Sequence, residues 1–114
     1  MLKYFTGYHR NLIGHTSLNE VIIILAACQI IISNDSGLMH IACALKRPVL
    51  ALYGATSNPM ITPPLFYKSK IIHNNPDNKI KTTKSQLHNL YGYHDSLINI
   101  TPKQVFKTLQ TLLN

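Results

Sequence analysis

Two short apolar runs with a helix-like segment between them constrain the fold of this chain most strongly. Residues 30–33 and 49–53 favour strands, because their apolar residues follow one another almost without polar interruption. Such continuous runs are typical of parallel strands that are covered on both faces. Residues 38–45 between them favour a helix, which Pro48 ends. The sequence therefore predicts a β-α-β unit in an α/β protein with a parallel sheet.

The turn between the first strand and this helix has the features of an anion site. Backbone N–H groups at a helix N-terminus lack partners in the helix, and the helix dipole adds partial positive charge there. Gly37 allows a ligand to approach the backbone closely, and Asp35 or Ser36 can cap the helix or hold a sugar hydroxyl. A plain helix cap with a glycine turn is the alternative.

A second polar turn, residues 54–57, follows the second predicted strand. The carboxyl ends of parallel strands meet at one edge of the sheet, which is where such folds bind ligands. We therefore expect the two turns to converge, and this convergence favours a ligand site.

The segments on either side of this unit have weaker signals. Ser17 and Glu20 form a capping-box pattern that predicts a helix to about residue 28, although the Ile and Val content would also permit a strand. Residues 18–32 are too short and too often polar to cross a membrane, for which about 20 apolar residues are needed. We expect them to form a buried core segment.

The region after the β-α-β unit contains one predicted strand and one predicted helix. Lys46 and Arg47 are expected in the last turn of the 38–45 helix, where they would favour its dipole. Residues 70–73 predict a short strand, and the polar residues 74–89 a loop. A final helix begins at Thr101 and Pro102. Its apolar stripe for packing on the sheet consists of Val105, Phe106, Leu109, Leu112 and Leu113.

Length, charge and cysteine content restrict the classes of partner. The 114 residues suffice for one small domain, and the net charge of +7 favours anionic partners. Nucleic acid is not expected, because the basic residues are scattered. Cys28 and Cys43 are expected as buried free thiols, and His40 with Cys43 makes a poor metal site, so we expect no metal. Without a signal-peptide apolar region at the N-terminus, the chain is expected to be cytoplasmic.

Four motifs, in order, carry a resemblance to a known family. They are Gly14-His15-Thr16-Ser17-Leu18, Asn34-Asp35-Ser36-Gly37-Leu38-Met39-His40, Arg47-Pro48-Val49-Leu50-Ala51-Leu52-Tyr53-Gly54 and Thr62-Pro63-Pro64-Leu65. The chain resembles the C-terminal domain of the ADP-heptose:lipopolysaccharide heptosyltransferases. Residues 92–102 are similar to the tail of the second enzyme of that series.

The resemblance implies a fold and a donor. The family has the two-domain GT-B fold, so residues 1–114 are expected to form a single, partial C-terminal domain. This domain would be Rossmann-like, with a partial parallel sheet and flanking helices, and would bind ADP-heptose. The N-terminal domain, which binds the lipid A–core acceptor and supplies the catalytic carboxylate, is expected to be absent. The resemblance accordingly implies no catalytic residue in this chain and no cofactor.

The resemblance also implies roles for particular residues. Ser36 and Gly37 would bind the diphosphate, and Asp35 would hold heptose hydroxyls. His40 would lie near the phosphates, with a buried helical histidine as an equal alternative. The full set of expected donor-binding residues is Thr16 beside the adenine, Asp35, Ser36, Gly37, Leu38, His40, Gly54 and Thr56. Ala55 stands where the family usually has proline.

Three functions remain open from the sequence. The first is the ADP-heptose-binding portion of a heptosyltransferase that acts on the lipopolysaccharide inner core. The second is a non-catalytic, truncated remnant, and the third is another nucleotide-sugar-binding GT-B protein, against which residues 62–65 and the tail at residues 92–102 argue. Peripheral contact with the cytoplasmic face of the inner membrane and self-association through exposed apolar surface are compatible with each.

Overall fold

The computed structural model describes residues 7–54, 58–74, 97 and 99–114. The elements are α1 (Leu18–Ala27), β1 (Ile31–Asn34), α2 (Gly37–Ala44), β2 (Val49–Tyr53), β3 (Ser69–His73) and α4 (Pro102–Leu113). The three strands form one sheet in the order β1-β2-β3, and both neighbouring pairs are parallel. The predicted α/β class and the β-α-β unit are confirmed, with β1 and α2 each displaced by one residue from their predicted bounds.

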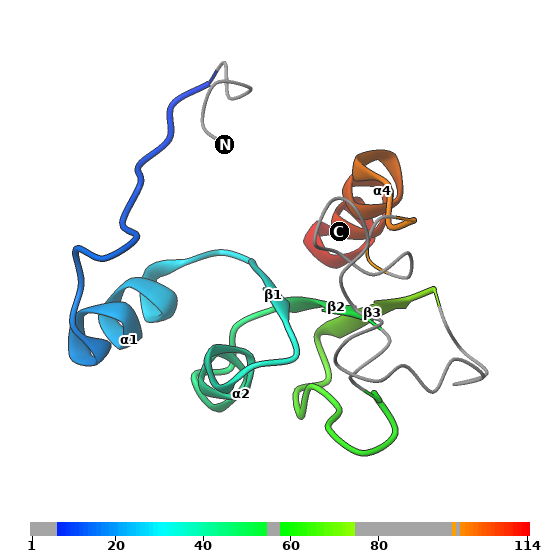
Figure 1. The fold of residues 1–114 in the computed structure, drawn as a ribbon, viewed down its shortest axis with the longest axis horizontal. Coiled ribbons are helices and arrows are strands. Elements are labelled where there is room, and N and C mark those ends of the chain that lie inside the picture. Colours follow the sequence, from blue (N-terminus) through cyan, green and yellow to red (C-terminus); the bar gives the residue numbers. More distant parts are fainter. Residues whose placement is uncertain (1–6, 55–57, 75–96, 98) are drawn as a thin grey trace, which may run out of the picture.

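Helices cover the sheet from both sides (Figure 1). In that view α2 lies below the sheet and α4 above it. The register pairs Ile31 with Val49 and Tyr53 with His73, so alternate residues of the strands share a face. The face toward α2 carries the main core, and Leu52 on the other face lines a groove beside α4.

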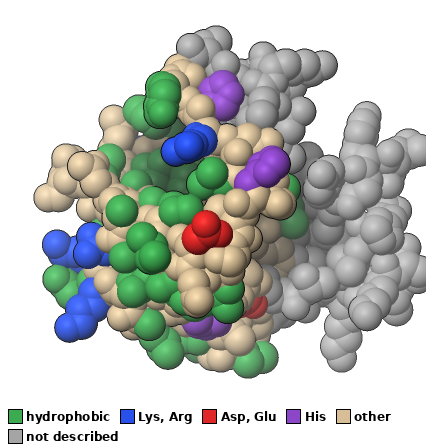
Figure 2. Space-filling model, turned by 90° about the vertical axis from the view of Figure 1, so that its left-hand side faces the viewer, with side chains coloured by type: hydrophobic (Ala, Val, Ile, Leu, Met, Phe, Trp, Pro, Cys, Tyr) green, Lys and Arg blue, Asp and Glu red, His purple; other side chains and the backbone are tan. Residues whose placement is uncertain are grey.

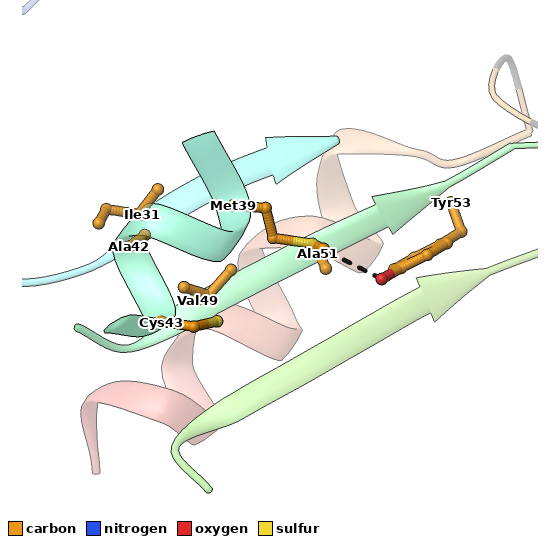
Figure 3. Packing of buried hydrophobic residues seen from close by; sticks show 7 residues of the cluster. All are labelled: Ile31, Met39, Ala42, Cys43, Val49, Ala51 and Tyr53. Carbon is orange, nitrogen blue, oxygen red and sulfur yellow. Dashed lines mark hydrogen bonds between the residues drawn. The ribbon is translucent and has the colours of Figure 1, made fainter. Parts of the chain in front are cut away.

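The core between α2 and the sheet is small and tightly closed. Met39, Ala42, Val49, Ala51 and Tyr53 are completely buried. They pack together with Ile31 and Cys43, as Figure 3 shows. This core fixes α2 on β1 and β2, and so fixes the position of the α2 N-terminus at the carboxyl edge of the sheet.

The C-terminal end of α2 differs from the prediction. The helix ends at Ala44, so Lys46 and Arg47 lie beyond its last turn rather than within it. Lys46 has a φ of 56°, its N–H donates to the Cys43 carbonyl, and the Arg47 N–H donates to the Ala42 carbonyl. These two bonds form a Schellman motif, which satisfies the last carbonyls of the helix through a left-handed residue. The chain therefore turns out of the helix before the basic side chains.

Helix α1 begins as predicted but is not buried as predicted. The Ser17 hydroxyl accepts from the Glu20 N–H, and the Ser17 N–H donates to Glu20 Oε2 at 2.7 Å, which completes the capping box. These bonds hold the pKa of the Glu20 carboxyl below its usual value. However, no residue of α1 is buried, and Ile23 is 70% exposed. The expectation of a buried segment is wrong for α1, because α2 is its main packing partner among the described elements.

The remaining predictions are confirmed in part. Thr101 caps α4 through the Gln104 N–H, with Pro102 in the first turn, and β3 forms where a strand was predicted. The apolar stripe of α4 only partly covers the sheet, since Phe106 is 63% exposed. Cys43 is buried, whereas Cys28 is only half-buried. Most of the predicted 74–89 loop lies outside the described residues. No helix in the described part of the chain is long and apolar enough to cross a membrane.

Candidate functional site

The carboxyl ends of β1 and β2 lie side by side. Asn34 at the end of β1 pairs with Leu52, one residue before the end of β2. The Asp35-Ser36 turn follows β1 directly and leads into α2. This arrangement places the start of α2 at the sheet edge where parallel α/β folds bind ligands.

Two backbone amides are available at the start of α2. Ser36 is the N-cap residue with extended backbone, and its carbonyl accepts from the Met39 N–H at 3.1 Å. The N–H groups of Gly37 and Leu38 have no acceptor among the described residues. Gly37 has open space where a Cβ would lie. The helix start can therefore receive an anion with two free donors and no side chain in the way.

The polar side chains of the turn do not cap the helix, contrary to one expectation. Ser36 makes no side-chain cap bond, and its Oγ lies 3.3 Å from Ser33 Oγ instead. The Asp35 carboxylate points to another segment, where its Oδ2 accepts from Thr62 Oγ1 at 2.8 Å. Both side chains remain available for contacts other than capping.

Asp35 is half-buried and has no cationic partner in the described part of the chain. A carboxylate without a cation repels a diphosphate and accepts hydrogen bonds from neutral hydroxyl groups. The site thus has two chemically different parts: amide donors for an anion and, beside them, a carboxylate for hydroxyls.

The other expected residues lie in varied surroundings. His40 is exposed, so its alternative placement as a buried histidine is wrong. Gly54 is buried, and a Cβ there would lie 2.9 Å from Leu97 Cγ. Thr16 is half-buried and lines a groove of about 420 Å³ with Arg10 and α1 side chains. Thr56 lies outside the described residues. The structure thus brings Asp35, Ser36, Gly37 and Leu38 together, with His40 one turn along α2.

Sequence reasoning did not assign a role to Tyr53 or Thr62 in the site. The buried Tyr53 hydroxyl donates to the Thr62 carbonyl at 2.5 Å and lies 3.6 Å from Met39 Sδ. Burial raises the pKa of Tyr53 to about 12, with the charge of Asp35 as a smaller cause. The Thr62-Pro63-Pro64-Leu65 motif was the available signal, but it carried no indication of which residue Thr62 would contact.

Comparison with known proteins decides the family. Residues 2–92 match the sequence signature of glycosyltransferase family 9 (heptosyltransferase). The chain belongs to this family. The predicted resemblance is therefore confirmed, and membership of family 9 argues against the alternative of another nucleotide-sugar-binding GT-B protein.

Several relatives in this family are similar to the chain over most of its length. It is 48% identical over 105 residues to lipopolysaccharide heptosyltransferase 2 of Escherichia coli, covering 91% of this chain and 29% of that protein. It is 46% identical over 106 residues to the Salmonella typhimurium protein of the same name, covering 92% and 29%. Lipooligosaccharide heptosyltransferase 2 of Haemophilus ducreyi is 48% identical over 115 residues, covering 99% of this chain and 32% of that protein.

A solved structure supports the fold of this family 9 chain. The E. coli ADP-heptose lipopolysaccharide heptosyltransferase II structure superimposes with a TM-score of 0.72 at 46% identity, covering 91% of this chain and 27% of that one. The three-stranded parallel sheet with flanking helices agrees with that heptosyltransferase fold. The chain spans about 30% of the length of the curated relatives that it matches.

Proposed function

We propose that this chain binds ADP-heptose as the donor-binding portion of a heptosyltransferase that acts on the lipopolysaccharide inner core. The observation that carries the proposal is the Asp35–Leu38 turn. Within the described part of the chain, its two amides have no acceptor and its carboxylate has no cationic partner. Membership of family 9 supports the identity of the donor.

Charge decides which group of the turn binds which part of the donor: the amides suit the anionic diphosphate, and the carboxylate suits the neutral sugar hydroxyls. The N–H groups of Gly37 and Leu38 receive the diphosphate, together with the Ser36 hydroxyl. Asp35 accepts from the heptose hydroxyls, and the exposed His40 lies one turn away along α2, near the proposed place of the phosphates. Thr16, Gly54 and Thr56 complete the proposed set by the family resemblance.

We expect acceptor binding and membrane contact to be properties of a whole heptosyltransferase. A lipid A–core acceptor would bind only with the N-terminal acceptor domain of the family. The net charge of +7 supports peripheral contact with the anionic cytoplasmic face of the inner membrane. A non-catalytic protein that binds the same donor is the second candidate, because the acidic side chains of the described residues, Glu20 and Asp35, bond to Ser17 and Thr62 and not to each other.

Calorimetric titration of the 114-residue chain with ADP and with ADP-heptose tests the proposal. We expect both nucleotides to bind, and Asp35→Asn to weaken ADP-heptose more than ADP, because only the sugar contacts this carboxylate. Asp77→Asn is the matched control, since it changes the net charge equally. If Asp35→Asn and Asp77→Asn change both affinities alike, general charge attraction explains binding and the assignment is wrong.

A further inference from the structure

Thr62 connects the candidate site to the protein core. Its hydroxyl donates to Asp35 Oδ2 at 2.8 Å, and its carbonyl accepts from the completely buried Tyr53 hydroxyl. These bonds cross 27 and 9 residues of sequence, so they join three separate segments. Thr62 is itself half-buried.

The segment that carries Thr62 is closed by its own hydrogen bonds. The Asn58 carbonyl accepts from the N–H groups of Ile61 and Thr62, at 2.9 and 3.0 Å. Asn58 Oδ1 accepts from the Met60 N–H at 2.9 Å. Pro63 follows directly, and a following proline restricts the backbone of Thr62 to extended conformations. The turn therefore presents the Thr62 hydroxyl in one defined place.

We propose that Thr62 is a positioning residue that orients the Asp35 carboxylate toward the sugar of the donor, and that Tyr53 holds Thr62 in place. This inference rests on the proposed function, because it assigns to Thr62 an effect on the sugar contact made by Asp35.

The hydrogen-bond chemistry explains how this positioning works. A threonine hydroxyl has a single proton, and the Asp35 oxygen at 2.8 Å is a closer acceptor than the Asn58 carbonyl at 3.3 Å. Donation to Oδ2 fixes the carboxyl rotamer, while Oδ1 has no partner among the described residues. Oδ1 is thus free to accept from a ligand hydroxyl. Because Thr62 is neutral, it orients the carboxylate without cancelling the charge that makes it a strong acceptor.

The chain of contacts also explains why Tyr53 is polar although it is completely buried. Phenylalanine would fill the same core position, but it could not hold the Thr62 carbonyl. Tyr53 contacts Met39 of α2 and also holds the Thr62 carbonyl (Figure 3 shows the contact with Met39). Tyr53 therefore fixes the position of Thr62 relative to α2.

The test compares Thr62→Val, which removes the hydroxyl at nearly constant shape, with Thr62→Ser, which keeps it. Calorimetric titration with ADP-heptose and ADP is the readout, after an NMR spectrum has verified that each variant is folded. We expect Thr62→Val to weaken ADP-heptose about three- to tenfold, from the cost of ordering one side chain on binding. We expect it to leave ADP unchanged, and Thr62→Ser to restore the wild-type difference between the two ligands.

Two further measurements separate positioning from general damage. In the Asp35→Asn background, Thr62→Val should have no additional effect on ADP-heptose, because the oriented group is already gone. Should Thr62→Val not fold, Thr62→Ala is compared with Thr62→Ser in the same way.

The outcomes distinguish this inference from the proposed function. If Thr62→Val binds ADP-heptose as tightly as the wild type, or weakens ADP equally, the positioning role is wrong while donor binding stands. If the wild-type chain binds neither ligand, the proposed function fails, and the role of Thr62 fails with it.

Discussion

Gly37 and Gly54 follow neighbouring strands, but their surroundings are opposite. A Cβ on Gly37 meets nothing within 4 Å, whereas one on Gly54 meets Leu97 Cγ at 2.9 Å. We expect Gly37→Ala to change the free energy of unfolding by less than about 0.5 kcal/mol, as for an open surface position, and to weaken donor binding. Gly54→Ala should cost about 1–3 kcal/mol through overpacking. Urea unfolding of both variants, with titration of ADP-heptose, measures the two effects.

Equal loss of stability in the two glycine variants would contradict the packing of Leu97 on Gly54. Undiminished donor binding by Gly37→Ala would show instead that no ligand approaches this part of the helix start. The two measurements therefore examine the core and the site independently.

Tyr53 gives the fold a dependence on pH in the alkaline range. Its pKa is about 12 in the folded chain, against about 10 in an unfolded one. Below pH 10 the phenol is protonated in both states, and between about 10 and 12 only the unfolded state loses the proton. The free energy of unfolding should thus fall as pH rises through this window, by up to about 1.4 kcal/mol per pH unit.

Comparison with Tyr53→Phe isolates this contribution, because the other tyrosines and the lysines titrate in both proteins. Urea unfolding at several pH values between 8 and 12 should show a steeper decline for the wild type. Parallel curves for the two proteins would mean that the Tyr53 phenol does not titrate differently on unfolding.

Residues of the site were predictable where local chemistry decides their position. Asp35, Ser36 and Gly37 were placed at the start of a helix because turn residues separate two apolar segments. The bond between Asp35 and Thr62 could not be predicted, since it joins residues 27 positions apart through one rotamer and one turn. Neither could the burial of Gly54, which depends on Leu97 from a distant part of the chain.

At the scale of elements, Lys46 is the position where the sequence conflicts with its local backbone. It adopts a φ of 56°, which favours glycine, in the Schellman motif after α2. We expect Lys46→Gly to stabilise the fold by about 0.5–1 kcal/mol, because removing the left-handed strain outweighs the added freedom of the unfolded chain. Lys107→Gly, in the interior of α4, is the matched control and should destabilise by a similar amount. Urea unfolding measures both, and destabilisation by Lys46→Gly would contradict the helix end described above.

Element starts were more predictable than element ends and burial. The capping box at Ser17 and the Thr101-Pro102 pair identify two helix starts from side chains that act locally. The end of α2 was misplaced, because no glycine marks the left-handed residue that ends it. The exposure of α1 was also missed. Hydropathy shows that a face can be buried, but the presence of a packing partner decides whether it is.

At the scale of the whole molecule, several large apolar side chains of the described residues are exposed. Ile23 on α1 and Ile13 before it are more than two-thirds exposed, and Figure 2 shows hydrophobic side chains gathered on the side of the molecule where α1 lies. A surface of this kind is typical of contact with further protein.

The 114-residue polypeptide alone should transfer no measurable heptose to a lipid A–core acceptor, even where it binds the donor. Among the described residues the acidic side chains are Glu20, which completes the capping box, and Asp35, which accepts from Thr62 with one of its two oxygens. Neither is paired as a general acid and base, and general-base assistance typically contributes about 10²–10⁴ in rate. Amides at the α2 start can stabilise departing ADP, but they cannot align an acceptor hydroxyl with the anomeric carbon. Heptose transfer is measured after incubation with both substrates, with and without the acceptor domain of a family 9 relative added in trans. If the polypeptide alone turns over substrate, and Asp35→Ala abolishes that turnover, the polypeptide is a complete catalyst and the prediction is wrong.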